Sequence, residues 1–277
     1  MILHTFFMGY AAVTFSHDMT EHPHPVLFYW DAYPRLGFSN FGDAISVSIV
    51  ERILGKSVET TTSGTALGRR KFLAVGSIVN YAEEGDVLWG TGVNGKYSKG
   101  SDYHFTALDV RAIRGPLSEQ FLMELGIACP KIYGDPTLLL PKLFPELQKS
   151  SSPSQEYVII PHFSDEHLFQ HLPNMVSVKE DWQEVVRKIL DSKFVISSAL
   201  SGIIVAEAFG IPARLLIAPN ENNTETIFKY ADYYCGTDRP NFRFATSVEE
   251  ALRMGGEPMP KCDLEELLQA FPYDVFE

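Results

Sequence analysis

The chain has 277 residues, of which 45% are hydrophobic, and its formal net charge is -12. A chain of this length and composition can bury substantial cores, and we expect two domains of medium size. The negative charge argues against nucleic acid or an anionic membrane as a partner, since either would require a basic face. Three widely spaced cysteines without metal-ligand spacing indicate a reducing compartment and no disulfide framework.

The first 15 residues are apolar, but they are too short to span a bilayer. They also lack the basic start of a signal peptide, and the charged stretch "SHDMTEHPHP" follows them directly. We therefore expect a cytoplasmic protein without a transmembrane segment.

Short β-branched or aromatic runs alternate with amphipathic stretches in the first half of the chain, a pattern typical of a parallel sheet covered by helices. The spacing predicts helices at residues 42–54 and 117–127. Strands are predicted at residues 26–30, 71–77, 86–92 and 107–115. Residues 133–155 are rich in proline and serine and do not read as regular structure, and the domain linker is placed at about 141–155.

The same alternation restarts after the linker. Strands are predicted at residues 156–163, 174–179, 194–197 and 213–218, with helices at 181–192, after residue 198 and in the C-terminal quarter. The pattern predicts two Rossmann-like doubly wound α/β halves with a cleft between them, the architecture called GT-B: an N-terminal domain at 1–140 and a C-terminal domain at 156–277. In such sheets ligands bind beyond the carboxyl ends of the strands.

Three hydroxyl groups, on Ser197, Ser198 and Ser201, lie where the strand at 194–197 passes into a helix. In one interpretation, Ser198 is simply the N-cap of that helix and has no role in ligand binding. The free N–H groups of a first helical turn and the positive end of the helix dipole also favour an anion, to which extra hydroxyls add donors. The sequence alone leaves both interpretations open.

Two loops of small residues at strand ends are candidate ligand sites. Asn40, Gly42 and Asp43 precede the first long helix, where the glycine permits a close approach and the polar side chains can bind sugar hydroxyls, although Asp43 could also be a simple cap. Gly90 and Gly92 belong to a glycine-rich loop that matches neither a dinucleotide fingerprint nor a P-loop. We interpret it as a loop of close approach.

A cation and an imidazole complete the candidate residues. Arg114 stands at the end of the strand at 107–115, where an arginine can bind a carboxylate or phosphate with two hydrogen bonds or form a surface ion pair. His162 follows a buried strand, where a proton-transfer group would be useful, although a lone histidine can also be a bystander.

Four motifs occur in the order found in the polysaccharide pyruvyl transferase family, which the chain resembles from about residue 26 to residue 234. They are "NFGDAI" (40–45), "RGPLS" (114–118), "GDPTLLLP" (134–141) and "VISSALSGIIVAEAFGIPA" (195–213). The resemblance implies a GT-B-like fold. It also implies transfer of the enolpyruvyl-derived group of phosphoenolpyruvate to a sugar of a bacterial surface polysaccharide (capsule or exopolysaccharide) or its precursor, forming a pyruvate ketal and releasing phosphate.

The resemblance also implies how the site is divided. Phosphoenolpyruvate carries a phosphate and a carboxylate, so its site needs cationic and N–H donors. The donor side is then expected to contain Arg114, Ser197, Ser198, Ser201 and Gly202. The acceptor side is expected to contain Asn40, Gly42, Asp43, Gly90 and Gly92. The acceptor is a sugar or a lipid-linked oligosaccharide, which could bring the protein to a membrane peripherally, and the chemistry requires neither a metal ion nor an organic cofactor.

One position departs from the family pattern. The family has a histidine, associated with the donor site and catalysis, where this chain has Ser201, and a serine cannot act as a general acid near neutral pH. We therefore expect His162 to supply the proton, with Arg114 as the second catalytic residue.

Two other functions remain open on the sequence. A nucleotide-sugar glycosyltransferase of the GT-B architecture would also use glycine-rich loops and an arginine for phosphate. A catalytically inactive saccharide-binding relative is the third alternative, motivated by Ser201.

Overall fold

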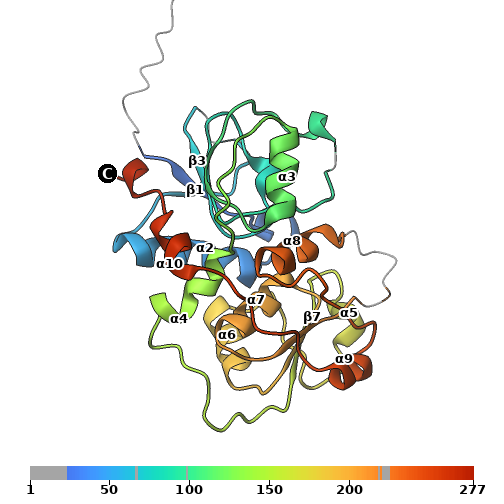
Figure 1. Ribbon diagram of the computed structural model, residues 1–277. Coiled ribbons are helices and arrows are strands. Elements are labelled where there is room, and N and C mark those ends of the chain that lie inside the picture. Colours follow the sequence, from blue (N-terminus) through green and yellow to red (C-terminus); the bar gives the residue numbers. More distant parts are fainter. Residues whose placement is uncertain (1–23, 66–67, 98, 218, 220–224) are drawn as a thin grey trace, which may run out of the picture.

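The computed structural model describes residues 24–65, 68–97, 99–217, 219 and 225–277 (Figure 1). In this part of the chain the fold is α/β, with two parallel sheets and helices interleaved between the strands. The apolar stretch at residues 1–15, for which the sequence predicts neither a signal peptide nor an anchor, lies outside the described residues. Among the residues that the structure describes, no helix is long and apolar enough to cross a membrane.

Both sheets consist of short strands that pair in parallel. The strand order is β2-β1-β3-β4-β5 in the first sheet and β6-β7-β8 in the second. The strands are β1 (Val26–Phe28), β2 (Thr60–Thr61), β3 (Lys71–Leu73), β4 (Val87–Trp89), β5 (Asp109–Ala112), β6 (Val158–Ile160), β7 (Val195–Ser197) and β8 (Ala213–Leu215). Parallel sheets covered on both faces are buried on both sides, which is why most of these strands read as continuous apolar runs.

Helices connect and cover the strands. The α-helices are α1 (Tyr33–Leu36), α2 (Phe41–Leu54), α3 (Pro116–Glu124), α4 (Leu140–Leu143), α5 (Glu166–Phe169), α6 (Trp182–Leu190), α7 (Leu200–Ala208), α8 (Phe228–Gly236), α9 (Val248–Met254) and α10 (Leu264–Gln269). Four 3-10 helices are described as well, η1 (Val79–Tyr81), η2 (Gly100–Asp102), η3 (Pro136–Leu139) and η4 (Tyr273–Val275). The predicted α/β class is thereby confirmed.

Residues 133–155 differ from the sequence prediction, because they are not wholly irregular. Asp135 caps η3 by accepting a hydrogen bond from the backbone N–H of Thr137, and α4 follows directly. Prolines at the first turns of both helices remove N–H groups that would have no helical partner, so they are compatible with these helix starts.

Residues 174–179 were predicted as a strand, and this prediction is wrong. The segment makes one isolated bridge, between Met175 and Ile159. Toward its end the segment bonds to a helix instead of a strand: the carbonyl of Val178 accepts a hydrogen bond of 2.9 Å from the N–H of Phe41 at the start of α2. A local β-pattern is overridden here by a tertiary contact.

The segment "FKYADYYCG" forms α8, which the periodicity of the sequence did not predict. Aromatic residues have modest helix propensity, and α8 buries residues on several faces, including Tyr230, Asp232 and Tyr233, so no single apolar stripe marks it.

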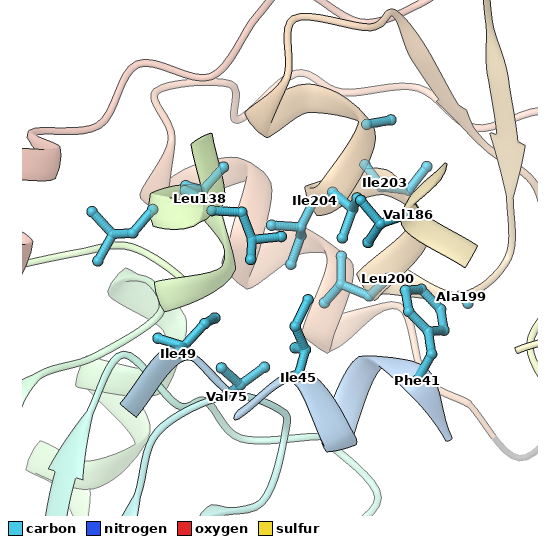
Figure 2. Packing of buried hydrophobic residues seen from close by; sticks show 14 of the residues in the cluster. Phe41, Ile45, Ile49, Val75, Leu138, Val186, Ala199, Leu200, Ile203 and Ile204 are labelled. Carbon is cyan, nitrogen blue, oxygen red and sulfur yellow. The ribbon is translucent and has the colours of Figure 1, made fainter. Parts of the chain in front are cut away.

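One hydrophobic core joins residues of both sheets, and α2 contributes several side chains to it. Figure 2 shows Phe41, Ile45 and Ile49 of α2 pointing toward Leu200 and Ile204 of α7. These side chains are at most 8% exposed. Because α2 follows β1 and α7 follows β7, this packing brings the ends of two strands from different sheets together.

The C-terminal segment returns to the first sheet after the second sheet is complete (Figure 1). The indole Nε1 of Trp89 donates a hydrogen bond of 2.8 Å to the carbonyl of Leu267 in α10. Phe271 and Phe276 pack against Phe72 of β3 through edge contacts of their rings. The last residues therefore cover the first sheet although they follow the second in sequence.

Candidate active site

A pocket of about 310 Å³ lies where the carboxyl ends of strands from both sheets meet. Its wall includes Trp30 after β1, Arg114 after β5, His162 after β6 and Ser201 after β7. In open α/β sheets, ligands bind at this end of the strands. Among the predicted residues, the structure brings Asn40, Gly42, Asp43, Arg114, His162 and Ser201 to this pocket.

The first turns of α2 and α7 touch at one end of the pocket. A Cβ atom added to Gly42 would lie 2.4 Å from Oγ of Ser201, so only glycine permits this approach without displacing the serine. Each first turn carries backbone N–H groups without intrahelical partners and the positive end of a helix dipole. Two helix N-termini at one place favour a negatively charged ligand.

Asp43 lies in the first turn of α2, on the pocket wall. Burial raises the pKa of Asp43 to about 7, and the opposing effects of the Asn40 hydrogen bond and of Lys229 do not offset it. The Asn40 side-chain amide donates that hydrogen bond to Oδ2 of Asp43. A carboxyl group with such a pKa can both give and accept a proton near pH 7.

This pKa predicts a pH-dependent effect of Asp43→Asn on stability. The folded-state pKa is raised, so the contribution of Asp43 to stability is present below its unfolded value of about 4 and is lost as the pH rises through about 7. Relative to the natural chain, the variant should gain roughly 2 kcal/mol in free energy of unfolding between pH 5 and pH 8. Urea unfolding at both pH values measures this gain.

Asp274→Asn is the matched control. Arg111 lowers the pKa of Asp274, so this carboxylate is ionised at both pH values and its replacement should change stability equally at each. A pH-independent difference for Asp43→Asn as well would mean that Asp43 stays ionised in the folded protein.

His162 is on the pocket wall, but its electrostatics differ from the prediction. Burial, reinforced by Lys229, lowers the pKa of His162 to about 4, so the imidazole is neutral near pH 7. Its Nδ1 lies 2.7 Å from Oγ of Ser164, and its backbone N–H donates to Oγ of Ser198 at 2.9 Å. A neutral imidazole is a poor proton donor at neutral pH, which favours Asp43 over His162 as the acid.

Arg114 is fully buried and binds protein partners on each guanidinium nitrogen. Its Nε donates to Asp232 of α8 at 3.0 Å, one terminal nitrogen donates to Ser77, and the other donates to the carbonyl of Val93 at 2.8 Å. The same Asp232 also accepts two hydrogen bonds from Ser118. These contacts favour a positioning role, in which Arg114 ties the pocket wall to α8, over direct contact with a ligand.

Ser197, Ser198 and Gly202 lie beside the pocket, outside its wall. The Ser197 hydroxyl binds the backbone at Ile160 and at Ala199, and the Ser198 hydroxyl donates to Oδ2 of Asp165 at 2.7 Å. The N-cap of α7 is Ala199, so the interpretation of Ser198 as N-cap is wrong. Helix α7 begins one residue later than expected after β7, because the Ser197 hydroxyl accepts a hydrogen bond from the Ala199 N–H and closes the turn between them.

Gly90 and Gly92 likewise lie outside the pocket wall. A Cβ atom on Gly92 would meet the Arg114 guanidinium at 2.4 Å, and one on Gly90 would meet Pro136 at 2.4 Å. Gly90 also has a φ of 78°, in the left-handed region that favours glycine. Both residues thus permit close packing behind the pocket.

Gly90→Ala is expected to destabilise the fold by roughly 2–4 kcal/mol, since backbone strain and overpacking act together. Gly37→Ala is the matched control, because Gly37 has a similar φ of 75° but nothing within 4 Å of an added Cβ. It should cost only about 1 kcal/mol. Equal losses of the two variants in urea unfolding would show that Pro136 moves aside.

The sequence did not single out a charged cluster in the pocket. Glu225 accepts hydrogen bonds from Lys229 and Lys96, and Nε2 of His162 lies 3.8 Å from the same carboxylate. Lys229 of α8 follows Glu225 by four residues, but Glu225 precedes the helix, so helical spacing does not identify this pair from the sequence. No local pattern links either residue to Lys96.

Aromatic rings form another part of the wall that the sequence did not indicate. Trp30 and Phe163 stack with their ring centroids 6.0 Å apart, and Phe38 packs against Phe163 at 5.6 Å. Trp30 follows β1 and Phe163 follows β6, so these rings touch across the two sheets. Within the described ranges, no group of three or more His, Cys, Asp or Glu residues is arranged to hold a metal ion.

The chain is similar to one protein family and to two individual proteins. The family model described as "Polysaccharide pyruvyl transferase" matches residues 40–220, more than half of the chain. An uncharacterized protein of Acanthamoeba polyphaga mimivirus is 25% identical over 252 residues, which are 83% of this chain and 84% of that protein. A crystal structure of a functional uncharacterized protein from Klebsiella pneumoniae is similar with a TM-score of 0.48 and 12% identity, over 81% of this chain and 95% of that one.

The family match contains the first turns of α2 and α7 and the residues Arg114 and His162. Membership implies a transferase with a pyruvyl transfer role in polysaccharide biosynthesis and a sugar or polysaccharide acceptor. On this match, the chain belongs to the polysaccharide pyruvyl transferase family.

Proposed function

We propose that the pocket transfers the enolpyruvyl-derived group of phosphoenolpyruvate to two hydroxyls of a sugar, forming a pyruvate ketal and releasing phosphate. The observation that carries this proposal is the meeting of two helix N-termini beside Asp43, whose pKa is about 7, and the ammonium groups of Lys96 and Lys229. An anionic donor that must be protonated needs both features.

The reaction begins with a proton on Asp43. Asp43 gives this proton to the methylene carbon of the donor, and the adjacent carbon becomes an oxocarbenium-like centre. A sugar hydroxyl attacks that centre and returns its proton to the Asp43 carboxylate. The bond to the phosphate oxygen then breaks with its electron pair on phosphate, and a second hydroxyl closes the ketal while its proton leaves with phosphate.

Positive charge around the pocket serves the departing phosphate. The N–H groups at the starts of α2 and α7 and the two lysines stabilise negative charge as it develops. Ser201 adds a hydroxyl donor at the same place. In this scheme Arg114, Ser198 and Gly202 position the wall, and no metal ion or organic cofactor takes part.

The acceptor is assigned to the side of Asn40, Gly42 and the aromatic rings. Trp30 and Phe163 present apolar ring surface next to polar groups, which suits the mixed apolar and hydroxylated faces of a hexose. A surface polysaccharide precursor, free or lipid-linked, fits this assignment, and a lipid-linked one would place the protein at the cytoplasmic face of a membrane.

We also propose a GT-B-like arrangement, in which the pocket lies between two domains. The pocket wall combines residues of the proposed N-terminal domain (1–140) with residues of the C-terminal domain (156–277). Residues 141–155 then act as the connection, and α10 returns to the first domain.

Ligand-dependent thermal stability tests the donor. Phosphoenolpyruvate should raise the melting temperature in a concentration-dependent way, since a ligand that binds only the folded state stabilises it. Nucleotide sugars should not. Stabilisation by a nucleotide sugar alone would favour the glycosyltransferase alternative, and binding of the donor without phosphate release for any acceptor would favour the inactive relative.

A further inference from the structure

Three charged side chains and an imidazole gather at one corner of the pocket: Lys96, Glu225, Lys229 and His162. Lys96 is in the loop after β4, His162 follows β6, and Lys229 lies in α8, so three separate parts of the chain supply the corner. The side chains of Glu225 and Lys229 are 7% and 8% exposed, and that of Lys96 is 35% exposed. The corner is therefore largely shielded from water, where ionic hydrogen bonds are strong.

The Glu225 carboxylate is held as an anionic ligand would be held. One oxygen pairs with Nζ of Lys96 and lies 3.8 Å from Nε2 of His162, and the other oxygen pairs with Nζ of Lys229. Burial alone would raise the pKa of Glu225, but Lys229 and His162 outweigh it and lower the pKa to about 2. The group that lies between these nitrogens is thus fully charged at any working pH.

The hydrogen bonds of Arg114 to protein groups favour the two lysines as the cations that bind a ligand. Each guanidinium nitrogen of Arg114 donates a hydrogen bond to the protein, to Asp232, Ser77 or the carbonyl of Val93. The ammonium groups of Lys96 and Lys229 are on the pocket wall as well, and each can rotate its three donors toward a new acceptor, which a planar guanidinium held by three partners cannot do.

We infer that Lys96, Lys229 and His162 form the subsite for the phosphate group of the donor, and that the Glu225 carboxylate competes with that phosphate for the same nitrogen atoms. Phosphate offers more acceptor oxygens than a carboxylate and forms charge-assisted bonds with the same groups. The identity of the donor rests on the proposed function, whereas the subsite itself does not. Phosphate can bind only while Glu225 does not occupy the nitrogens, so the apparent affinity for phosphate is reduced to the intrinsic affinity multiplied by that free fraction. The same competition helps the product phosphate to leave.

A purely structural ion pair predicts the opposite sign. If Glu225 only fixes the two lysines in place, its removal loosens their positions and weakens anion binding. If Glu225 competes, its removal tightens anion binding. The direction of the change in dissociation constant therefore separates the two.

The test is calorimetric titration of the intact chain with inorganic phosphate at pH 7. Glu225→Gln keeps the shape of the side chain and removes its charge, and we expect phosphate to bind at least about tenfold more tightly. Glu146→Gln is the matched control, since it removes one carboxylate from the exposed pair with Arg52 and should leave phosphate binding unchanged. An unchanged or weaker phosphate affinity in Glu225→Gln overturns the inference.

A second variant tests the same subsite in case Glu225→Gln does not fold. Lys96→Gln changes a partly exposed side chain and should weaken phosphate binding about tenfold in the otherwise natural chain. An unchanged affinity there also overturns the inference.

Parallel titrations with phosphoenolpyruvate and with uridine diphosphate identify the source of the phosphate. Tighter binding of phosphoenolpyruvate by Glu225→Gln supports both the subsite and the proposed donor. Tighter binding of uridine diphosphate, with no binding of phosphoenolpyruvate, supports the subsite and removes the proposed donor.

Discussion

Replacing Asp43 with asparagine is expected to lower the turnover of pyruvyl transfer by roughly a hundredfold or more, with little change in phosphoenolpyruvate affinity. Asparagine keeps the size of the side chain but cannot give a proton to carbon. In the natural chain the acid form of Asp43 is required, so turnover should fall as the pH rises through about 7, the pKa that burial gives this group. The variant should lose this inflection.

Asp274→Asn, remote from the pocket, should leave both turnover and the pH profile unchanged. His162→Gln separates the two candidate acids, because the pKa of His162 is lowered to about 4 and its loss should leave the inflection near pH 7 in place. Normal turnover of Asp43→Asn, or loss of the inflection only in His162→Gln, would return the acid role to His162.

Replacing Arg114 with methionine is expected to destabilise the fold by roughly 3–5 kcal/mol. The substitution leaves Asp232 buried without its cation, and both side chains are fully buried. Combining it with Asp232→Asn removes the stranded charge and should recover part of the loss. Urea unfolding of the single and double variants measures both effects.

The exposed pair of Arg52 with Glu146 is the control, and Arg52→Met should change the stability little. A small loss of stability for Arg114→Met together with a large loss of phosphoenolpyruvate affinity would instead show that Arg114 contacts the donor directly.

The sequence predicts the elements of the sheets better than their contacts. Apolar β-branched runs marked β1, β3 and β4, because a strand buried on both faces requires such residues along its whole length. Asn40, Gly42 and Asp43 were placed correctly in the loop and first turn of a helix, since capping and turn chemistry are local. The strand prediction at 174–179 failed because the segment pairs with β6 only around Met175, and the carbonyl of Val178 accepts a hydrogen bond from α2 instead.

The chemistry of the site was less predictable, because it depends on burial and on pairs far apart in the chain. Arg114 and Asp232 are separated by 118 positions, and no local pattern relates them. The raised pKa of Asp43 arises from the burial of its carboxyl group in the folded protein. The extent of that burial cannot be read from the sequence. Their positions at the ends of strands predicted that Asp43 and Arg114 reach the pocket wall, but not the burial and partners on which their proposed roles depend.

Pyruvyl transfer in heavy water is the decisive experiment for proton donation by Asp43 and for ketal formation. Phosphoenolpyruvate is incubated in D₂O with the protein and a panel of hexosides and lipid-linked oligosaccharides, and the products are analysed by mass spectrometry together with phosphate release. We expect an acceptor that carries a pyruvate ketal with a single deuterium in its methyl group, one phosphate released per ketal, and loss of both in Asp43→Asn. Glycosyl transfer from a nucleotide sugar without ketal formation, or a ketal formed equally well by Asp43→Asn, would contradict this expectation.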